Sequence, residues 1–159
     1  MIYENLKIYF HNVYKNTLIV NTILKTFFDY NIIFIQELPW SIIWSIPSST
    51  CSEGDVLIGA PYHPNWLSFA RPPTMQSNSP RVMVYVSICL SSFHFLLQKD
   101  IINHKNILFI SFFTNNICSF IMNIYSNTSH SALKYLKDTE VNISNLLIMT
   151  GDFNIRNWS

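Results

Sequence analysis

Short apolar segments that are followed at once by polar side chains constrain the fold of this chain more than any other feature of its sequence. The clearest case is the apolar run 146–149, which leads into Gly-Asp-Phe-Asn at 151–154. Asn12 follows an earlier apolar segment in the same way, and Gln36 and Glu37 follow another. A buried strand fixes the polar side chains at its end. We therefore expect a sheet protein whose polar residues gather at one edge, with a tight turn at Gly151.

The periodicity of the apolar residues predicts an alternation of strands and helices along the chain. The expected elements are strands at 6–12, 32–35, 56–59, 66–70, 82–86, 93–97 and 146–150, helices at 15–29 and 131–141, and a hairpin across 107–125. Ser131 is the expected N-cap of the second helix. The order is β-α-β, then a strand-rich middle, then β-α-β. It predicts a layered α/β protein with a mixed sheet or a pair of packed sheets, in one domain of residues 1–159.

Composition limits the kinds of partner that the chain can bind. The sequence is 49% hydrophobic and 15% aromatic, which is enough apolar material for a sizeable core. Its formal net charge is +1 with only 12% charged residues, so there is no basic field typical of dedicated nucleic-acid binding. A nucleic-acid substrate is still compatible with this charge, because a metal ion can supply the positive charge. The three cysteines form no close pair, and we expect them to be reduced and mostly buried.

One apolar segment has the length of a membrane span. Residues 107–125 are nearly apolar, but the polar triplet 114–116 interrupts them at the centre. Polar residues at that depth would be costly in a bilayer, whereas a hairpin needs them at its turn, so we expect a hairpin and no membrane partner. The N-terminus has no apolar core of signal-peptide length, which predicts an intracellular location.

Three strand ends carry side chains that are suited to metal-assisted chemistry. Asn12, Glu37 and Asp152 offer carboxylate and carboxamide oxygens, which are ligands for Mg²⁺ or Mn²⁺ rather than for zinc. Such a site favours phosphate chemistry. Each residue also has an ordinary interpretation, as a turn cap, a solvated acid or a polar loop, and only their joint order favours a site.

Other polar and aromatic residues have weaker claims to a function. His63 and Asn65 could contact a substrate, but a proline-rich aromatic loop is more often a packed surface turn. Arg71 and Arg81 could contact phosphate, but each is better interpreted as a solvated charge at a strand edge. Three tryptophans could stack on bases, although packing is the simpler interpretation for Trp40, Trp44 and Trp66.

Four short segments together resemble a known superfamily. They are Phe10-His11-Asn12, Ile35-Gln36-Glu37, Ile124-Tyr125-Ser126 and Gly151-Asp152-Phe153-Asn154. Their order and spacing resemble those of the endonuclease/exonuclease/phosphatase superfamily. The residues within the motifs most resemble those of the endonuclease domains of non-LTR retrotransposons. The resemblance implies an α/β (α+β) four-layer sandwich of two packed mixed β-sheets flanked by helices, with a metal-dependent phosphodiesterase site at one edge.

The resemblance also implies a role for each site residue. Glu37 resembles the main metal ligand and Asn12 its companion, with Mg²⁺ or Mn²⁺ as the cofactor. Asp152 resembles the residue that orients or deprotonates the attacking water, and Asn154 the amide that positions water and phosphate. Tyr125 resembles a phenol that hydrogen-bonds a phosphate oxygen. Metal, base and hydrogen-bond donors together would stabilise the transition state of phosphodiester cleavage.

One part of the superfamily pattern has no counterpart here. Family members carry an Asp-His type motif after the Gly-Asp-Phe-Asn strand, whereas all five histidines of this sequence precede Asp152. We therefore expect the N-terminal portion of a retroelement-derived endonuclease that acts on DNA, in the nucleus among intracellular compartments, with weak or no activity. The alternatives are a non-catalytic retroelement remnant and a phosphatase that acts on a small or lipid phosphate.

Overall fold

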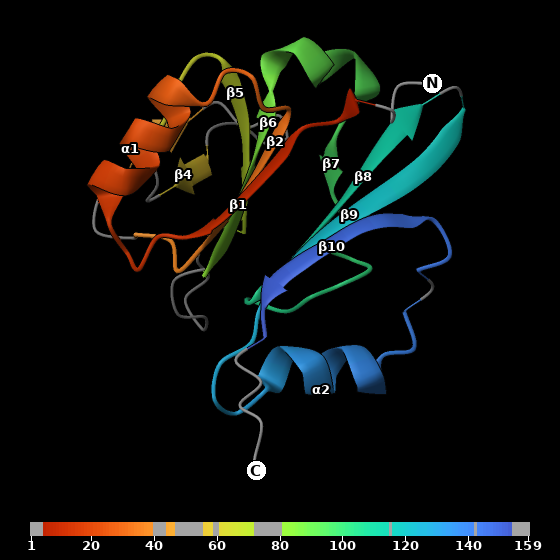
Figure 1. The fold of residues 1–159 in the computed structure, drawn as a ribbon. Coiled ribbons are helices and arrows are strands. Elements are labelled where there is room, and N and C mark those ends of the chain that lie inside the picture. The colour runs from red at the N-terminus through yellow and green to blue at the C-terminus, as the bar shows by residue number, and fades with distance from the viewer. Residues whose placement is uncertain are drawn as a thin grey trace.

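The computed structural model describes residues 5–39, 44–46, 56–58, 61–71, 81–114, 116–141 and 143–153, with the backbone alone for 44–46 and 56–58. Its elements, coloured along the chain in Figure 1, are β1 Ile8–Asn12, α1 Thr17–Thr26, β2 Ile32–Gln36, β3 Trp44–Ile46, β4 Val56–Ile58, β5 Trp66–Ala70, β6 Val82–Ser87, η2 Ile88–Phe93, β7 Leu96–Leu97, β8 Ile107–Thr114, β9 Ile117–Tyr125, α2 Ser131–Asp138 and β10 Leu146–Asp152.

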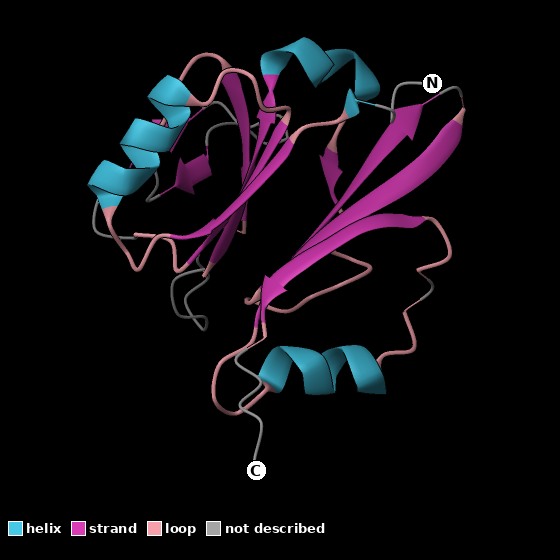
Figure 2. Ribbon diagram, viewed as in Figure 1, coloured by secondary structure: helices cyan, strands magenta, loops and turns pink. Residues whose placement is uncertain are grey.

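Two mixed sheets of four strands form the centre of the structure. The first has the order β1-β2-β6-β5 and the second the order β10-β9-β8-β7, while β3 and β4 pair separately. β1 runs parallel to β2, and β10 runs parallel to β9; the other pairs are antiparallel. Figure 2 shows the two sheets facing each other, with α1 outside the first and α2 outside the second. The expected four-layer sandwich of two packed mixed sheets is confirmed.

Three apolar clusters correspond to the three interfaces between these layers. One lies between α1 and the first sheet and contains Val20, Leu24 and Tyr85. The next lies between the two sheets, and the last joins the second sheet to α2 through residues such as Ala132. All five residues of β2 are buried, because this strand is covered by α1 on one face and by the second sheet on the other.

The first helix is shorter than the expected 15–29. Asn16 takes the N-cap position, and its side-chain oxygen accepts hydrogen bonds from the backbone N–H groups of Leu18 at 3.0 Å and Ile19 at 3.2 Å. The cap satisfies two N–H groups that have no partner within the helix. Val20, Ile23 and Leu24 then form the buried stripe.

Two further boundaries differ from the sequence prediction. The expected strand 93–97 is reduced to Leu96–Leu97, because η2 extends to Phe93 and is followed by the left-handed His94. η2 begins where the Ser87 side chain accepts a hydrogen bond from the Cys89 N–H. The predicted N-cap Ser131 is the first residue of α2, and His130 occupies the cap position. Asn127 provides the side-chain bond instead, because its Oδ1 accepts from the Ser131 N–H at 3.3 Å.

The 107–125 segment forms the expected hairpin. Its strands β8 and β9 pair in antiparallel register from Ile107↔Ile124 to Thr114↔Ile117. Within the described parts of the chain, no helix is long and apolar enough to cross a membrane. The prediction of mostly buried cysteines is wrong for the two that the structure describes, since Cys89 is exposed and Cys118 is half-buried; Cys51 lies outside the described residues.

Candidate active site

Four of the five predicted site residues meet at one edge of the sandwich. Asn12 and Glu37 lie at the carboxyl ends of β1 and β2, which coincide because these strands are parallel. Tyr125 and Asp152 end the parallel strands β9 and β10 in the same way. Asn12 Nδ2 donates to Asp152 Oδ2 at 3.0 Å, and the Tyr125 hydroxyl donates to Glu37 Oε1 at 3.0 Å. Each of these hydrogen bonds joins one sheet to the other. Asn154 lies outside the described residues.

A buried pair of amides fixes the two sheets relative to each other beside this cluster. Gln36 Nε2 donates to Asn123 Oδ1 at 3.1 Å and to the carbonyl of Ile124 at 2.6 Å. Asn123 Nδ2 donates back to the carbonyls of Ile35 at 3.1 Å and Met83 at 3.0 Å. Both amide side chains are fully buried. Because Gln36 precedes Glu37 and Asn123 lies two residues before Tyr125, the amide pair holds those two side chains in register.

The turn after β1 and the residue after β2 are held in an unusual backbone conformation. Tyr14, Lys15 and Glu37 have φ values of 50°, 60° and 48°, in the left-handed region that non-glycine residues rarely adopt. Backbone hydrogen bonds hold them there: Lys15 N–H donates to the Glu37 carbonyl at 2.7 Å, and Val13 N–H donates to the Gln36 carbonyl at 3.0 Å. Such strain often marks a functional site.

Gly151 has a role different from the predicted turn. β10 runs through it to Asp152, and it pairs with Ile124 of β9. A Cβ at this position would lie 2.7 Å from the Ile124 carbonyl oxygen and 3.0 Å from the ring of Phe153. Glycine is therefore required for close approach of the two strands and for the ring that folds over it. The expected turn at Gly151 is wrong, because the strand continues through it.

The environment of Tyr125 keeps its hydroxyl protonated. Burial raises the pKa of Tyr125 above its ordinary value, and the hydrogen bond to Glu37 and the charge of that carboxylate raise it further. Asp152 adds a smaller effect in the same direction, while the positive charge of Arg81 opposes them. A neutral phenol remains a hydrogen-bond donor across the physiological range.

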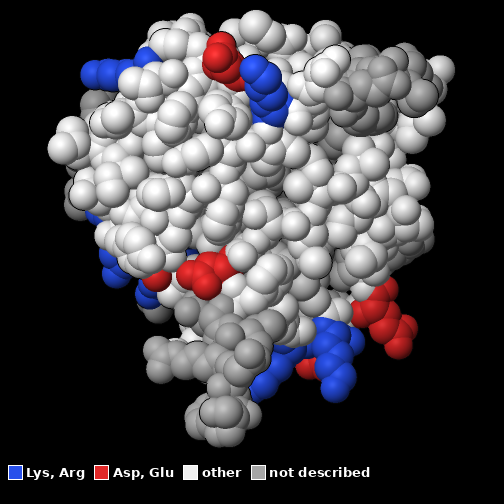
Figure 3. Space-filling view, in the orientation of Figure 1, with Lys and Arg blue, Asp and Glu red and all other residues white. Residues whose placement is uncertain are grey.

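Arg81 is a site residue that the sequence interpretation assigned to solvent. Its guanidinium carbon lies 5.3 Å from the centre of the Tyr125 ring, within cation–π distance. The sequence holds one signal for this position. Arg81 directly precedes β6, which is antiparallel to β2, so the start of β6 lies at the same edge as the end of β2. Figure 3 shows that most of the drawn face carries no charged side chain.

The other residues considered from sequence have mainly structural environments. Trp66 is 4% exposed and its Nε1 donates to the Leu24 carbonyl at 3.1 Å, so the packing interpretation is confirmed. Arg71 is not the predicted solvated charge. It is half-buried, and it donates to Asn103 Oδ1 at 2.8 Å and to the carbonyls of Ile102 and Lys99. Burial lowers the pKa of Arg71.

The remaining loop residues are placed as follows. His63 Nδ1 accepts from the Asn65 backbone N–H at 3.3 Å, a local contact within the loop before β5. Trp40 and the side chain of Trp44 lie outside the described residues.

The cluster suits a hard cation that keeps most of its water ligands. Glu37 and Asp152 offer carboxylates and Asn12 a carboxamide oxygen, which is the ligand chemistry of Mg²⁺. The described residues contain no group of three or more His, Cys, Asp or Glu that could hold a metal ion. The type of the donor atoms fits Mg²⁺ or Mn²⁺, whereas their number among the described residues is below that of a preformed metal site.

The architecture of the chain is an α+β sandwich of two mixed sheets. Among solved structures, it is similar to the endonuclease domain of TRAS1, a telomere-specific non-LTR retrotransposon, with 14% sequence identity and a TM-score of 0.57. The alignment covers 95% of this chain and 60% of that chain. At this identity the likeness shows a shared fold and leaves the activity open.

Two alignments to beta toxin from Staphylococcus aureus have TM-scores of 0.40 and 0.43, which are too low to carry an argument. Their identities are 10% and 9%; they cover 97% of this chain, and 69% and 67% of the toxin chains. The sequence matches no protein-family model and no curated protein.

Proposed function

We propose that the site catalyses metal-dependent hydrolysis of phosphodiester bonds, with DNA as the substrate. One observation carries the proposal: four side chains at the strand ends of two sheets are joined pairwise by hydrogen bonds across the edge. Asn12, Tyr125 and Asp152 end their strands, and Glu37 directly follows β2. The shared fold with a retrotransposon endonuclease domain supports a nucleic-acid substrate and a retroelement origin. This chain aligns with 60% of that domain's chain, so the activity of the whole domain is likewise a proposal for this chain.

Each residue has a definite task in this proposal. Asp152 accepts a proton from the attacking water, and the hydrogen bond from Asn12 Nδ2 holds its carboxylate in one orientation. The Tyr125 hydroxyl, kept protonated by its raised pKa, donates to a phosphate oxygen when substrate enters. Arg81 lies over the same ring and adds positive charge beside that oxygen. Asn154, two positions after Asp152 in the sequence, is proposed to position the attacking water and the phosphate.

Glu37 and Asn12 are the proposed ligands of the metal ion. The left-handed backbone at Glu37 and the hydrogen bond from Tyr125 fix its carboxylate at the edge. When bound, Mg²⁺ supplies charge neutralisation on the phosphate and a more acidic water. With so few protein ligands, the binding is expected to be weak.

Nicking of supercoiled plasmid with Mg²⁺ or Mn²⁺ is the direct test. Wild type should nick the plasmid, and Asp152→Asn and Glu37→Gln should abolish nicking, whereas Asp138→Asn on the exposed face of α2 should leave the rate unchanged. Mn²⁺ titration of wild type and Glu37→Ala then tests the metal site, because equal binding by both proteins would remove Glu37 from it. Nicking that persists in Asp152→Asn would refute the proposal, and no nicking by wild type would favour a non-catalytic protein.

A further inference from the structure

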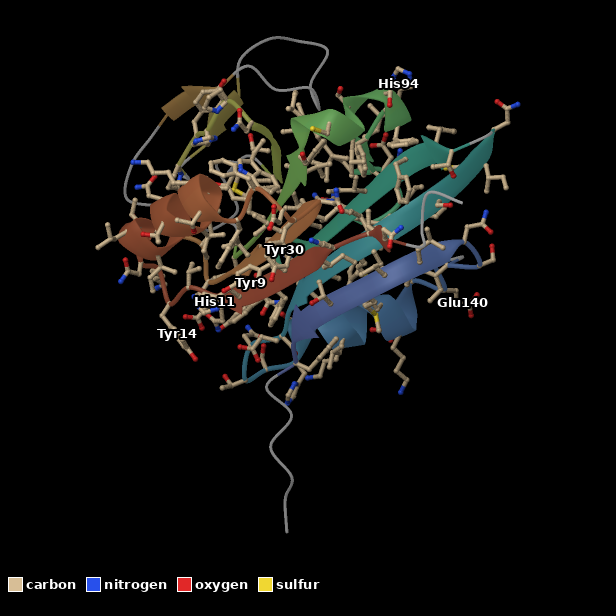
Figure 4. The ribbon with its side chains drawn as sticks, turned by 45° about the horizontal axis from the view of Figure 1, so that its top comes forward. Tyr9, His11, Tyr14, Tyr30, His94 and Glu140 are labelled. Carbon is tan, nitrogen blue, oxygen red and sulfur yellow. The ribbon has the colours of Figure 1, made fainter. Side chains whose placement is uncertain are left out.

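Tyr14 is an exposed aromatic residue beside the site that has no evident part in folding. Its side chain is 74% exposed and makes no hydrogen bond or ring contact with the described residues. By contrast, Tyr9 lies two residues before His11 on β1 and packs against Phe27 with ring centroids 4.5 Å apart. Figure 4 shows Tyr14 directed outward beyond Tyr9 and His11. Single exposed tyrosines are common on protein surfaces, so exposure alone would not indicate a function for Tyr14.

The backbone of Tyr14 is neither relaxed nor free to move. Its φ of 50° is followed by 60° at Lys15, so two successive non-glycine residues occupy the left-handed region. The turn is pinned by hydrogen bonds from Lys15 N–H to the Glu37 carbonyl at 2.7 Å and from Asn16 N–H to the Val13 carbonyl at 2.9 Å. Glycine or asparagine would adopt this conformation at lower cost. The sequence instead holds a large aromatic ring here in a fixed, strained position.

This position is directly connected to the proposed catalytic residues. The Tyr14 backbone N–H donates to Asn12 Oδ1 at 3.0 Å, and Asn12 Nδ2 donates to Asp152 at 3.0 Å. The adjoining Lys15 is also exposed and carries a positive charge. An aromatic ring can stack on a base, and a neighbouring cation can contact a phosphate. Each nucleotide of a nucleic-acid strand offers both groups.

We propose that Tyr14 stacks on a nucleobase next to the bond to be cleaved, and so makes the site prefer nucleic acid over small phosphodiesters. This inference rests on the proposed function, since it names a specificity residue of the same site. Stacking needs only the face of a base, so the preference is for nucleic acid in general and not for one sequence. This role accounts for the strained backbone, because a ring that is already held in place loses little conformational freedom when a base binds.

The experiment is a cycle of two changes, one in the protein and one in the DNA. Binding of fluorescent single-stranded oligonucleotides of about four residues, short enough to fill the site in one register, is measured by anisotropy in EDTA, with each base in turn replaced by an abasic residue. For wild type, removal of one particular base should weaken binding about tenfold. For Tyr14→Leu the same removal should have no further effect, and Tyr14→Trp should retain the wild-type response.

Two additional variants separate recognition from folding. Tyr14→Asn suits a left-handed backbone, so its melting temperature should equal or exceed that of wild type while the response to the missing base is lost. Tyr62→Leu removes another half-exposed tyrosine and should keep the response. Tyr62 lies four residues before β5, whose first residue Trp66 pairs with Ser87 at the end of β6 opposite to Arg81. Equal effects of base removal on wild type and Tyr14→Leu at every position would overturn the inference, as would loss of the response in Tyr62→Leu.

The outcome is independent of the nicking test. The proposed function fails if Asp152→Asn nicks DNA as fast as wild type, whatever Tyr14 does. The inference fails if base removal and Tyr14 are uncoupled in EDTA, even when nicking depends on Asp152. Absence of any oligonucleotide binding by wild type in EDTA would overturn the inference, while the nicking test with Mg²⁺ would still decide the proposed function.

Discussion

The carboxamide of Asn12 donates a hydrogen bond of 3.0 Å to the carboxylate of Asp152, 140 positions further along the chain. Asn12 ends β1 of the first sheet and Asp152 ends β10 of the second. The two sheets therefore meet at their edge through one neutral donor and one charged acceptor. A charged acceptor strengthens such a bond about twofold over a neutral pair.

Replacement of the donor by a second acid should make the stability of the protein depend on pH. In Asn12→Asp, two carboxylates face each other, so at least one has a folded-state pKa above its unfolded value. Stability from protonation of that group is present at low pH and lost as the pH rises. Relative to wild type, Asn12→Asp should be about 1–3 kcal/mol less stable near pH 8 and nearly equal near pH 3.

Urea unfolding at the two pH values measures this difference. Asn12→Ala is the control, because it removes the hydrogen bond without adding a charge and should show a much smaller change between the two pH values. A constant penalty for Asn12→Asp at both pH values would show that the new carboxylate does not face Asp152.

The strand ends that form the site could be predicted from sequence, whereas their connections could not. Asn12, Glu37 and Asp152 each follow an apolar run, and parallel pairing brings such ends to one edge. The bond between Gln36 and Asn123 depends on the register of one sheet over the other, which local periodicity does not encode. The left-handed backbone at Tyr14 was likewise unpredictable, because no glycine or Asn-Gly pair marks it.

The amide pair between the sheets should contribute strongly to stability. Asn123→Ala removes two donors and one acceptor from a fully buried position, leaving Gln36 and the carbonyls of Ile35 and Met83 short of partners. Each buried polar group left without a partner costs about 1–3 kcal/mol, so we expect a loss of about 2–5 kcal/mol in the free energy of unfolding.

Chemical denaturation of Asn123→Ala beside Asn21→Ala checks this value. Asn21 lies on α1, and its side chain makes no hydrogen bond within the described residues, so the same truncation there should change the free energy of unfolding by under about 0.5 kcal/mol. Similar losses in the two variants would mean that the amide pair adds nothing beyond the local effect of truncation.

Gly151→Ala should weaken the pairing of β10 with β9. The added methyl group would lie 2.7 Å from the backbone oxygen of Ile124, which cannot move without shifting the strand. Overpacking of this kind costs about 1–3 kcal/mol. The shift would also displace Asp152, so nicking should fall by more than the loss of folded protein explains.

A second substitution identifies which contact is responsible. Phe153→Leu relieves the contact with the ring, 3.0 Å away, and leaves the backbone contact in place. Gly151→Ala with Phe153→Leu should therefore remain as unstable in urea as Gly151→Ala alone. Full recovery would assign the requirement for glycine to the ring instead of to the approach of β9.

Alkaline pH should destabilise the protein through its buried tyrosines, and Tyr125 is the one that belongs to the site. Burial, with the hydrogen bond and charge of Glu37, raises its pKa above 10.0, while Tyr85 is shifted upward by burial alone. A folded-state pKa above the unfolded value gives stability that is complete below about pH 10 and is lost as the pH rises further. Tyr125→Phe lacks the ionisable group, so its stability should fall less steeply above that pH.

Absorbance of tyrosinate during alkaline titration should show Tyr125 and Tyr85 ionising only as the protein unfolds. Tyr62→Phe, at a half-exposed position, is the control and should leave the slope unchanged. Ionisation of Tyr125 in the folded protein near pH 10 would mean that the hydroxyl is not held by Glu37, and that its role as a constant donor at the site is wrong.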